Sequence, residues 1–300
     1  NYDSRIRRAI RAAKSSLSQP HSQPSFAPCL SANALSQPTS VPSQPASAPS
    51  QPANTHGQPS SSPKRPQGHT FLQFNVNGIK NSLTELNCFL HDKQIKIACL
   101  QETRLSAKAK APSFPGYTVL RKDRLVGNGG GVAILIHHSV NFIPIDTSAI
   151  TQGDDVMELQ GVTATINGSS INVFNLYLPP ASSCPPQYKP NLNPLFSHSD
   201  SDAIIMGDLN AHHGAWFASS TCPRGEAIID DVESSSFCVI NTDTPTRLPS
   251  QGNSNSPDVT LISAHLALSA VWGTHVKCTS DQLPISIDVG GDSPPVRSAK

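Results

Sequence analysis

The sequence lacks a dominant sign of charge. Its 22 lysine and arginine residues nearly balance its 21 aspartate and glutamate residues, which leaves a formal net charge of +1. A chain with so little net charge has no general attraction for polyanions. Any contact with nucleic acid must therefore come from a local basic patch.

Paired cysteines and long apolar runs are missing as well. The seven cysteines are scattered, and none forms a CxxC or Cys/His pair with the spacing of a zinc site. This pattern indicates reduced thiols in an intracellular protein. No apolar run reaches the roughly 18 residues of a transmembrane helix, and no signal peptide is recognisable, so we expect no membrane contact. Because the chain begins with asparagine rather than methionine, we expect a piece of a longer product.

The first 68 residues differ in composition from the rest of the chain. Residues 1–17 carry basic side chains on a loose helical period, which indicates either a solvated basic tail or an arm for nucleic-acid binding or nuclear import. Residues 17–68 contain six Gln-Pro pairs and almost no large apolar side chains. Such a segment cannot bury enough surface to offset its ordering entropy, so we expect a disordered, Ser/Gln/Pro-rich linker.

Beyond residue 68 the sequence alternates between short strands and a few helices. Residues 71–78 and 95–103 have strand patterns, and between them Ser82 and Glu85 predict a capping box at the start of a helix that ends near residue 93. This order predicts a βαβ unit. Many strands and few helices favour an α/β sandwich built on two sheets. A second helix is expected at 224–237, and further strands at 117–121, 130–137, 156–162, 170–178, 204–208, 238–241, 257–262, 271–276 and 283–289.

Polar side chains stand at the ends of several predicted strands. The apolar run that ends in Gly207-Asp208-Leu209-Asn210 predicts a buried strand whose two polar residues point the same way. A carboxylate and a carboxamide together suit a hydrated metal ion, a phosphate and an attacking water. Each such strand end also has a purely structural explanation, as a turn, a cap or a solvated end. The full set is Asn75, Asn77, Glu102, Tyr177, Asp208, Asn210, Asp258, Asp281 and Gln282.

Six segments, taken in order, resemble the endonuclease/exonuclease/phosphatase superfamily. They are FNVNG, LQETR, NLYLPP, GDLNAHH, SPDVTLIS and SDQLPISI, and the last three with Trp216 look most like the endonuclease domain of non-LTR retrotransposons. The resemblance implies a four-layer α/β/β/α sandwich of two packed mixed sheets, DNase I-like, over residues 69–292. Residues 1–68 would precede this domain, and residues 293–300 would be a tail or a linker to a downstream reverse transcriptase.

The resemblance also implies a metal site and a base. Glu102 would hold Mg²⁺, or Mn²⁺, with support from Asn75, Asn77 and Asp281. Asp208 would orient or deprotonate the attacking water. No small-molecule cofactor is expected.

Phosphate oxygens would be bound by Tyr177 and Asn210, together with Asn75 and Gln282. In the family a histidine follows the Ser-Asp pair and is paired with the residue at Asp258, but here the sequence is Ser280-Asp281-Gln282. Glutamine donates a hydrogen bond, but it cannot take up and transfer a proton or carry a positive charge. We therefore expect a weakened or inactive nuclease in which Asp258 has lost its ionic partner. Histidines at 212, 213, 265 and 275 are less favoured substitutes.

Four functions compete. The first is an endonuclease that nicks double-stranded DNA inside the nucleus and leaves a 3′-OH for reverse transcription. The second is an apurinic-site repair endonuclease, and the third is a DNA-binding module without catalysis. A phosphoinositide phosphatase is least favoured because no basic pocket for clustered phosphates is evident. DNA contacts are expected in loops 105–116 and 244–256, and the basic residues for the non-catalytic alternative are Arg104, Lys108, Lys110, Arg121, Lys122 and Arg124.

Overall fold

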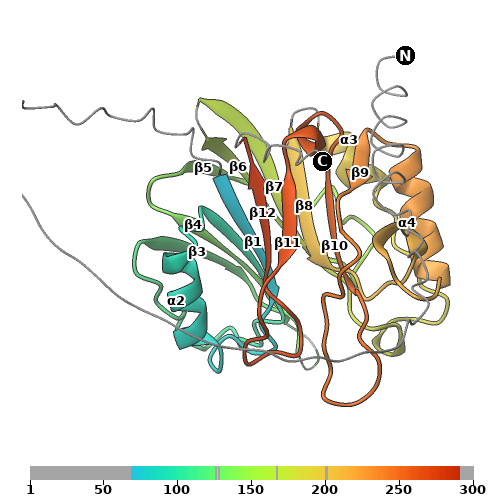
Figure 1. Ribbon diagram of the computed structural model, residues 1–300, viewed down its shortest axis with the longest axis horizontal. Helices are drawn as coiled ribbons and strands as arrows, with labels where there is room; N and C mark the ends of the chain where they lie inside the picture. The colour runs from blue at the N-terminus through green and yellow to red at the C-terminus, as the bar shows by residue number, and fades with distance from the viewer. Residues whose placement is uncertain (1–68, 126, 128, 167, 200–201, 291–300) are drawn as a thin grey trace, which may run out of the picture. The chain divides into compact units, whose positions relative to one another are not determined.

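The computed structural model in Figure 1 describes residues 69–290 except 126, 128, 167, 200 and 201. The basic arm and the linker predicted for residues 1–68, and the tail predicted for 293–300, lie outside the described residues. Within the described part, no helix is both long enough and apolar enough to cross a membrane.

The described residues form two mixed six-stranded sheets (Figure 1). The first sheet consists of β1 (His69–Asn75), β2 (Ile97–Gln101), β3 (Tyr117–Lys122), β4 (Val132–His137), β11 (Val271–Thr274) and β12 (Ile285–Val289). Its order is β11-β12-β1-β2-β4-β3. The second sheet consists of β5 (Asn141–Ile145), β6 (Glu158–Ile166), β7 (Ser169–Tyr177), β8 (Ala203–Asp208), β9 (Phe237–Val239) and β10 (Asp258–Ser263). Its order is β5-β6-β7-β8-β10-β9.

The predicted βαβ unit is confirmed, but its predicted helix cap is wrong. Strands β1 and β2 pair in parallel, and α2 (Leu83–Asp92) connects them. The Ser82 hydroxyl is buried and donates to the carbonyl of Val76 at 3.1 Å, so it makes no cap to the helix. The Glu85 carboxylate accepts hydrogen bonds from the amide and hydroxyl of Thr279 at 2.8 and 2.6 Å. The side chains of Ser82 and Glu85 therefore bind groups outside the helix and do not form the capping box.

Three further elements differ from the prediction. Strand β5 was not predicted; it contains Pro144 and lies at the edge of its sheet, where a missing N–H is tolerated. The short helix α3 (Asn193–His198) was also not predicted. Helix α4 (Pro223–Glu233) ends earlier than expected, because Phe237 belongs to β9 and stacks on Phe196 with ring centroids 4.8 Å apart.

The layers follow from the strict alternation of side chains along the strands. In β1, Phe71 packs in the cluster between the two sheets, whereas Leu72 and Phe74 pack in the cluster that α2 covers. On the second sheet, the outer cluster contains residues of both α3 and α4. Helices therefore cover the outer face of each sheet, with α2 and α4 on opposite sides in Figure 1. The four-layer α/β/β/α sandwich is confirmed.

Buried polar side chains also join the two sheets. Asn175 of β7 donates to the carbonyl oxygens of Leu100 and Ala133 at 3.0 and 2.9 Å, and accepts from the Gln101 amide at 2.7 Å. Gln73 of β1 donates to the carbonyl of Gly207 in β8 at 2.9 Å. Because a buried polar group without a partner is costly, these bonds hold one sheet in a fixed position on the other.

Replacement of Asn175 by alanine tests this role. The variant removes three bonds between the sheets and leaves the buried carbonyls of Leu100 and Ala133 without this donor and the Gln101 amide without its closer acceptor, so we expect the free energy of unfolding to fall by about 3 kcal/mol. Urea denaturation followed by circular dichroism measures it. Asn141→Ala, at an exposed position of β5, is the matched control and should change stability by less than about 0.5 kcal/mol. Equal losses for the two variants would contradict the assignment.

Candidate active site

Strand register brings the predicted polar residues to one end of the sandwich. Tyr177, Asp208 and Asp258 are aligned across β7, β8 and β10. Asn75 ends β1 opposite Gln101 of β2, and Glu102 follows directly. Gly207 allows the backbones of β7 and β8 to lie close together at this end, because a Cβ at Gly207 would lie 2.2 Å from the Leu176 carbonyl oxygen.

Asp208 is the most buried acid of this set and accepts three hydrogen bonds. They come from Asn75 Nδ2 at 2.7 Å, Gln282 Nε2 at 2.8 Å and the backbone N–H of Asn210 at 3.1 Å. Burial raises the pKa of Asp208, and the charge of Glu102 raises it further, whereas the three donors oppose this shift. The carboxylate is thus fixed in orientation and, compared with a solvated aspartate, readily protonated.

Glu102 lies beside Asp208 but reaches solvent, with a side chain 16% exposed. It accepts hydrogen bonds from Asn75 Nδ2 at 3.2 Å and from the Tyr177 hydroxyl at 3.1 Å. Its other oxygen pairs with the Arg104 guanidinium at 2.6 Å. Burial first, and then the charges of Glu102 and Asp208, raise the pKa of Tyr177. Tyr177 therefore stays a phenol and a hydrogen-bond donor.

Asn75 connects these two acids. Its amide nitrogen donates to both, and its Oδ1 accepts from the backbone N–H of Asn77 at 3.0 Å, which fixes the orientation of the amide. The Ser280 hydroxyl donates to the backbone carbonyl of Asn75 at 2.9 Å. The result is a continuous hydrogen-bonded chain that spans both sheets, which we call the strand-end network: Tyr177, Glu102, Asn75, Asp208 and Gln282.

Asp258 is buried next to this network and is held by neutral donors. The Thr246 hydroxyl donates to it at 2.6 Å and Gln73 Nε2 at 3.1 Å. Burial, followed by the charge of Asp208, raises the pKa of Asp258 well above its ordinary value. Gln282 donates to Asp208 and not to Asp258. The sequence analysis missed Gln73 and Thr246; Gln73 could have been found, because it lies two residues before Asn75 on the same face of β1.

Three predicted residues differ in placement from the rest. Asp281 pairs with Arg247, at 2.7 Å between its Oδ2 and the guanidinium. Asn77 is exposed and has a left-handed backbone, with φ of 46°. Strand β8 ends at Asp208, so the expectation that Asn210 continues it is wrong. Asn210 has φ of 44°, and its side chain donates to the carbonyl of Leu178 at 3.0 Å.

A buried arginine that the sequence analysis missed supports the loops behind the network. Arg224 donates through one nitrogen to the carbonyl oxygens of Pro179, Leu209 and Asn210 at 2.7, 3.2 and 3.3 Å. These carbonyls belong to the segments that follow β7 and β8. A cation in contact with three loop carbonyls fixes the geometry from which Asn210 projects.

Three of the four histidines named as substitutes for an imidazole at position 282 have other partners. His265 pairs with Asp202, His213 lies 3.8 Å from Glu226, and His275 contacts the Ser286 hydroxyl at 2.9 Å. The structure gives no support to their replacing the missing imidazole.

The donor chemistry fits a hydrated magnesium ion better than a zinc ion. Among the described residues, no group of three or more histidine, cysteine, aspartate or glutamate side chains is arranged to hold a metal. Zinc sites need three or four such ligands. Magnesium keeps several waters and uses one or two carboxylates, a role for which the partly exposed Glu102 is suited.

Similarity to known sequences agrees with this geometry. A family model described as endonuclease-reverse transcriptase matches residues 171–286. The probable RNA-directed DNA polymerase from transposon X-element of Drosophila melanogaster is 29% identical over 233 residues, 75% of this chain and 24% of that protein. The RNA-directed DNA polymerase from mobile element jockey of the same organism is 26% identical over 174 residues, 58% of this chain and 18% of that protein. The chain spans about a quarter of the length of these relatives or less.

Solved structures share the fold. The endonuclease domain of TRAS1, a telomere-specific non-LTR retrotransposon, superposes with a TM-score of 0.60 at 16% identity, over 75% of this chain and 100% of that one. The AP endonuclease LMAP from Leishmania major also gives 0.60, at 15% identity, over 76% of this chain and 89% of that one. The resemblance inferred from the six segments is confirmed: residues 171–286 match the endonuclease-reverse transcriptase family, and the described residues have the fold of the TRAS1 endonuclease domain.

Proposed function

We propose that this domain hydrolyses a phosphodiester bond of double-stranded DNA, nicks the target site of a retrotransposon and leaves a 3′-OH that primes reverse transcription. The observation that carries the proposal is the strand-end network, which joins two acids, a phenol and two carboxamides from distant parts of the chain. The names of the relatives, RNA-directed DNA polymerases, support a downstream reverse transcriptase in the same product. Its place of action would be the nucleus.

Glu102 is the proposed metal ligand, with Asn75 as its hydrogen-bonded support and Asn77 and Asp281 acting through water. The ion, Mg²⁺ or Mn²⁺, supplies charge neutralisation on the phosphodiester and on the leaving oxygen when it is bound. Glu102 presents one oxygen to Asn75 and Tyr177 and the other to Arg104. It is therefore oriented before any ligand arrives.

Asp208 is the proposed base. Three donors hold its carboxylate, and its raised pKa makes it a better proton acceptor for an attacking water than a solvated carboxylate. The Tyr177 phenol and the Asn210 amide are the proposed donors to phosphate oxygens, with Asn75 and Gln282 beside them. Asp258 stays buried behind Asp208, and its role is to hold Thr246 and Gln73 in place.

Gln282 lowers the expected activity. It keeps a hydrogen bond to Asp208, at 2.8 Å, but an amide cannot carry a proton or a positive charge near the phosphate. We propose a nuclease that is weakened or inactive for this reason.

The alternative of a DNA-binding module without catalysis depends on free basic side chains near the network. Arg121 binds Asp123 and two carbonyls, Lys122 binds the carbonyl of Leu159, and Arg124 pairs with Glu158. These internal partners occupy three of the six basic residues, whereas Lys108 and Lys110 are exposed, so the catalytic interpretation rests on the strand-end network and not on a lack of basic surface.

Restoring the imidazole is the first test. Gln282→His in the full chain should nick supercoiled plasmid in Mg²⁺ faster than the wild type, by about 10²-fold, which is the lower end of what general acid–base help provides. The control is Gln152→His, at an exposed position, which should leave the rate unchanged. Strong and equal nicking by the wild type and Gln282→His would show that the glutamine is not limiting.

Removing the proposed base is the second test. Asp208→Asn in the Gln282→His background should reduce nicking by at least about 10²-fold, because the variant cannot accept a proton. Asp230→Asn, at an exposed position of α4, is the matched control. Duplexes with and without an abasic site separate target nicking from abasic repair. If DNA binds in EDTA and no variant nicks with any divalent metal, the module without catalysis is correct.

A further inference from the structure

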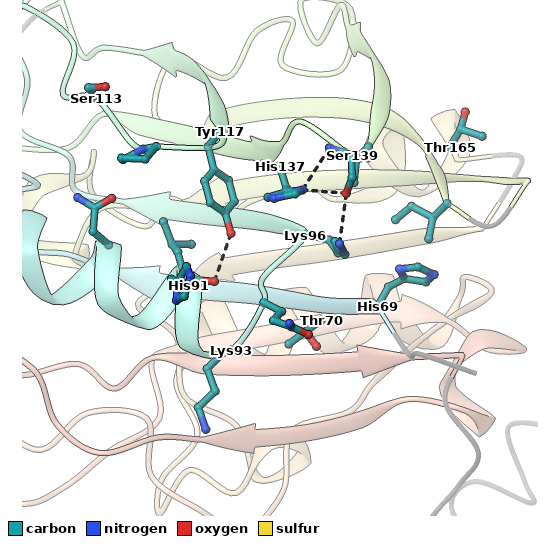
Figure 2. Close-up of a pocket in the computed structure, with 16 residues that line it drawn as sticks. His69, Thr70, His91, Lys93, Lys96, Ser113, Tyr117, His137, Ser139 and Thr165 are labelled. Carbon is teal, nitrogen blue, oxygen red and sulfur yellow. Dashed lines mark hydrogen bonds between the residues drawn. The ribbon is translucent and has the colours of Figure 1, made fainter. Parts of the chain in front are cut away.

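An open groove lies at the end of the sandwich opposite the strand-end network. It has a volume of about 1220 Å³ and is lined by residues that begin β1, precede β2 and end β4 (Figure 2). Strand β1 runs from His69 in the groove to Asn75 in the network. At about 3.3 Å per residue, the two ends are about 20 Å apart.

The groove has a basic lining. Its basic members are two lysines and three histidines, and the lining contains no aspartate or glutamate. Two acids lie just outside the lining: Asp92 is 3.6 Å from His91, and Asp288 accepts the hydroxyl of Thr70 at 2.5 Å. Within the lining itself, the polar groups other than the lysines are neutral or can become cationic. The basic members are Lys93, Lys96, His69, His91 and His137.

Hydrogen bonds hold part of this lining in position. Figure 2 shows Lys96, Ser139 and His137 close together, with Lys96 Nζ 3.2 Å from the Ser139 hydroxyl. The backbone N–H of Ser139 donates to Nδ1 of His137 at 3.1 Å, so the neutral ring carries its proton on Nε2. The Tyr117 ring packs edge-on against His137, with centroids 5.3 Å apart, and its hydroxyl is fixed by the carbonyl of Ile95 at 2.6 Å.

We propose that this groove binds the phosphodiester backbone of a nucleic-acid strand, as a second site separate from the strand-end network. Lysine ammonium groups and imidazole, hydroxyl and amide donors are the groups that bind phosphate oxygens without reading sequence. The volume exceeds the roughly 300–1,000 Å³ of a small-molecule pocket, and the groove is open, so it suits an extended polyanion. The site does not require the domain to be catalytic.

Amine footprinting tests the contact directly. The full chain in EDTA is acetylated with and without a 12-nucleotide single-stranded DNA, and modification is measured by mass spectrometry. Lys93 and Lys96 should be protected, and the exposed Lys189 should be modified equally in both samples. Equal modification of Lys93 and Lys96 in both samples would overturn the proposal. Equal protection by inorganic phosphate alone would also overturn it, because it would identify a site for free phosphate.

A charge-neutralising variant gives an independent test. For Lys93→Gln/Lys96→Gln, fluorescence anisotropy of the same oligonucleotide in EDTA should show a weaker affinity. The slope of log K against log salt should be smaller by about 1.4, since each contact to a single strand contributes about 0.7. Lys189→Gln is the control. An unchanged slope in the double variant would contradict the site, whereas loss of nicking alone would concern only the proposed endonuclease.

Discussion

The strand-end network depends on the contacts that the carboxamide of Asn75 makes. This carboxamide lies on the first sheet and reaches Asp208 on the second at 2.7 Å, while it also contacts Glu102. Two carboxylates this close repel one another, and burial adds to the cost of their charge. A donor shared between them reduces both effects. The two sheets have to be packed to within a fraction of an ångström for a single amide to do this.

The need to hold the two sheets in a fixed relative position explains why other polar residues are buried between them. Gln73 and Asn175 cross from one sheet to the other within the apolar core, and each has its hydrogen bonds satisfied on the opposite side. Apolar packing tolerates small sliding movements, whereas hydrogen bonds of 2.7–3.1 Å do not. Within the first sheet, Ser280 from the loop before β12 donates to the backbone carbonyl of Asn75 and so fixes that loop on the end of β1. The site is therefore positioned by polar contacts and stabilised by apolar ones.

The sequence correctly predicted residues whose position follows from the two-residue alternation of a strand. Asn75 and Asp208 end apolar strands and Asp258 begins one that pairs antiparallel with β8, so their placement at one end of the sandwich follows from local pattern and strand direction. Contacts between residues far apart in sequence could not be predicted in the same way. Gln73 and Asp258 are 185 positions apart, and no local signal joins them. The capping box failed for the same reason, because Glu85 binds Thr279, 194 positions away.

Backbone conformation was the other feature that could not be predicted from the sequence. Glu102 and Asn210 both have positive φ, of 51° and 44°, where a strand pattern predicts extended geometry. Non-glycine residues in this region cost free energy and persist where the surroundings hold them. Here the holding contacts are visible: Asn210 is bound through its backbone N–H to Asp208, and Arg224 binds its carbonyl. At both positions the side chain leaves the strand direction: Glu102 contacts Asn75 and Tyr177 of the network, whereas Asn210 donates to the carbonyl of Leu178.

The proposed metal ligand Glu102 is ion-paired with Arg104. Arg104 is about half exposed, so its ion pair contributes at most about 1 kcal/mol. In the proposed function, a divalent cation on the same carboxylate would bring twice the charge and would displace the guanidinium at little cost. Asn75 and Tyr177 contact the oxygen of Glu102 that Arg104 leaves free, so their hydrogen bonds need not break when the exchange occurs. The carboxylate can change its cationic partner while its orientation is preserved, which is what a metal ligand at a solvent-facing strand end requires.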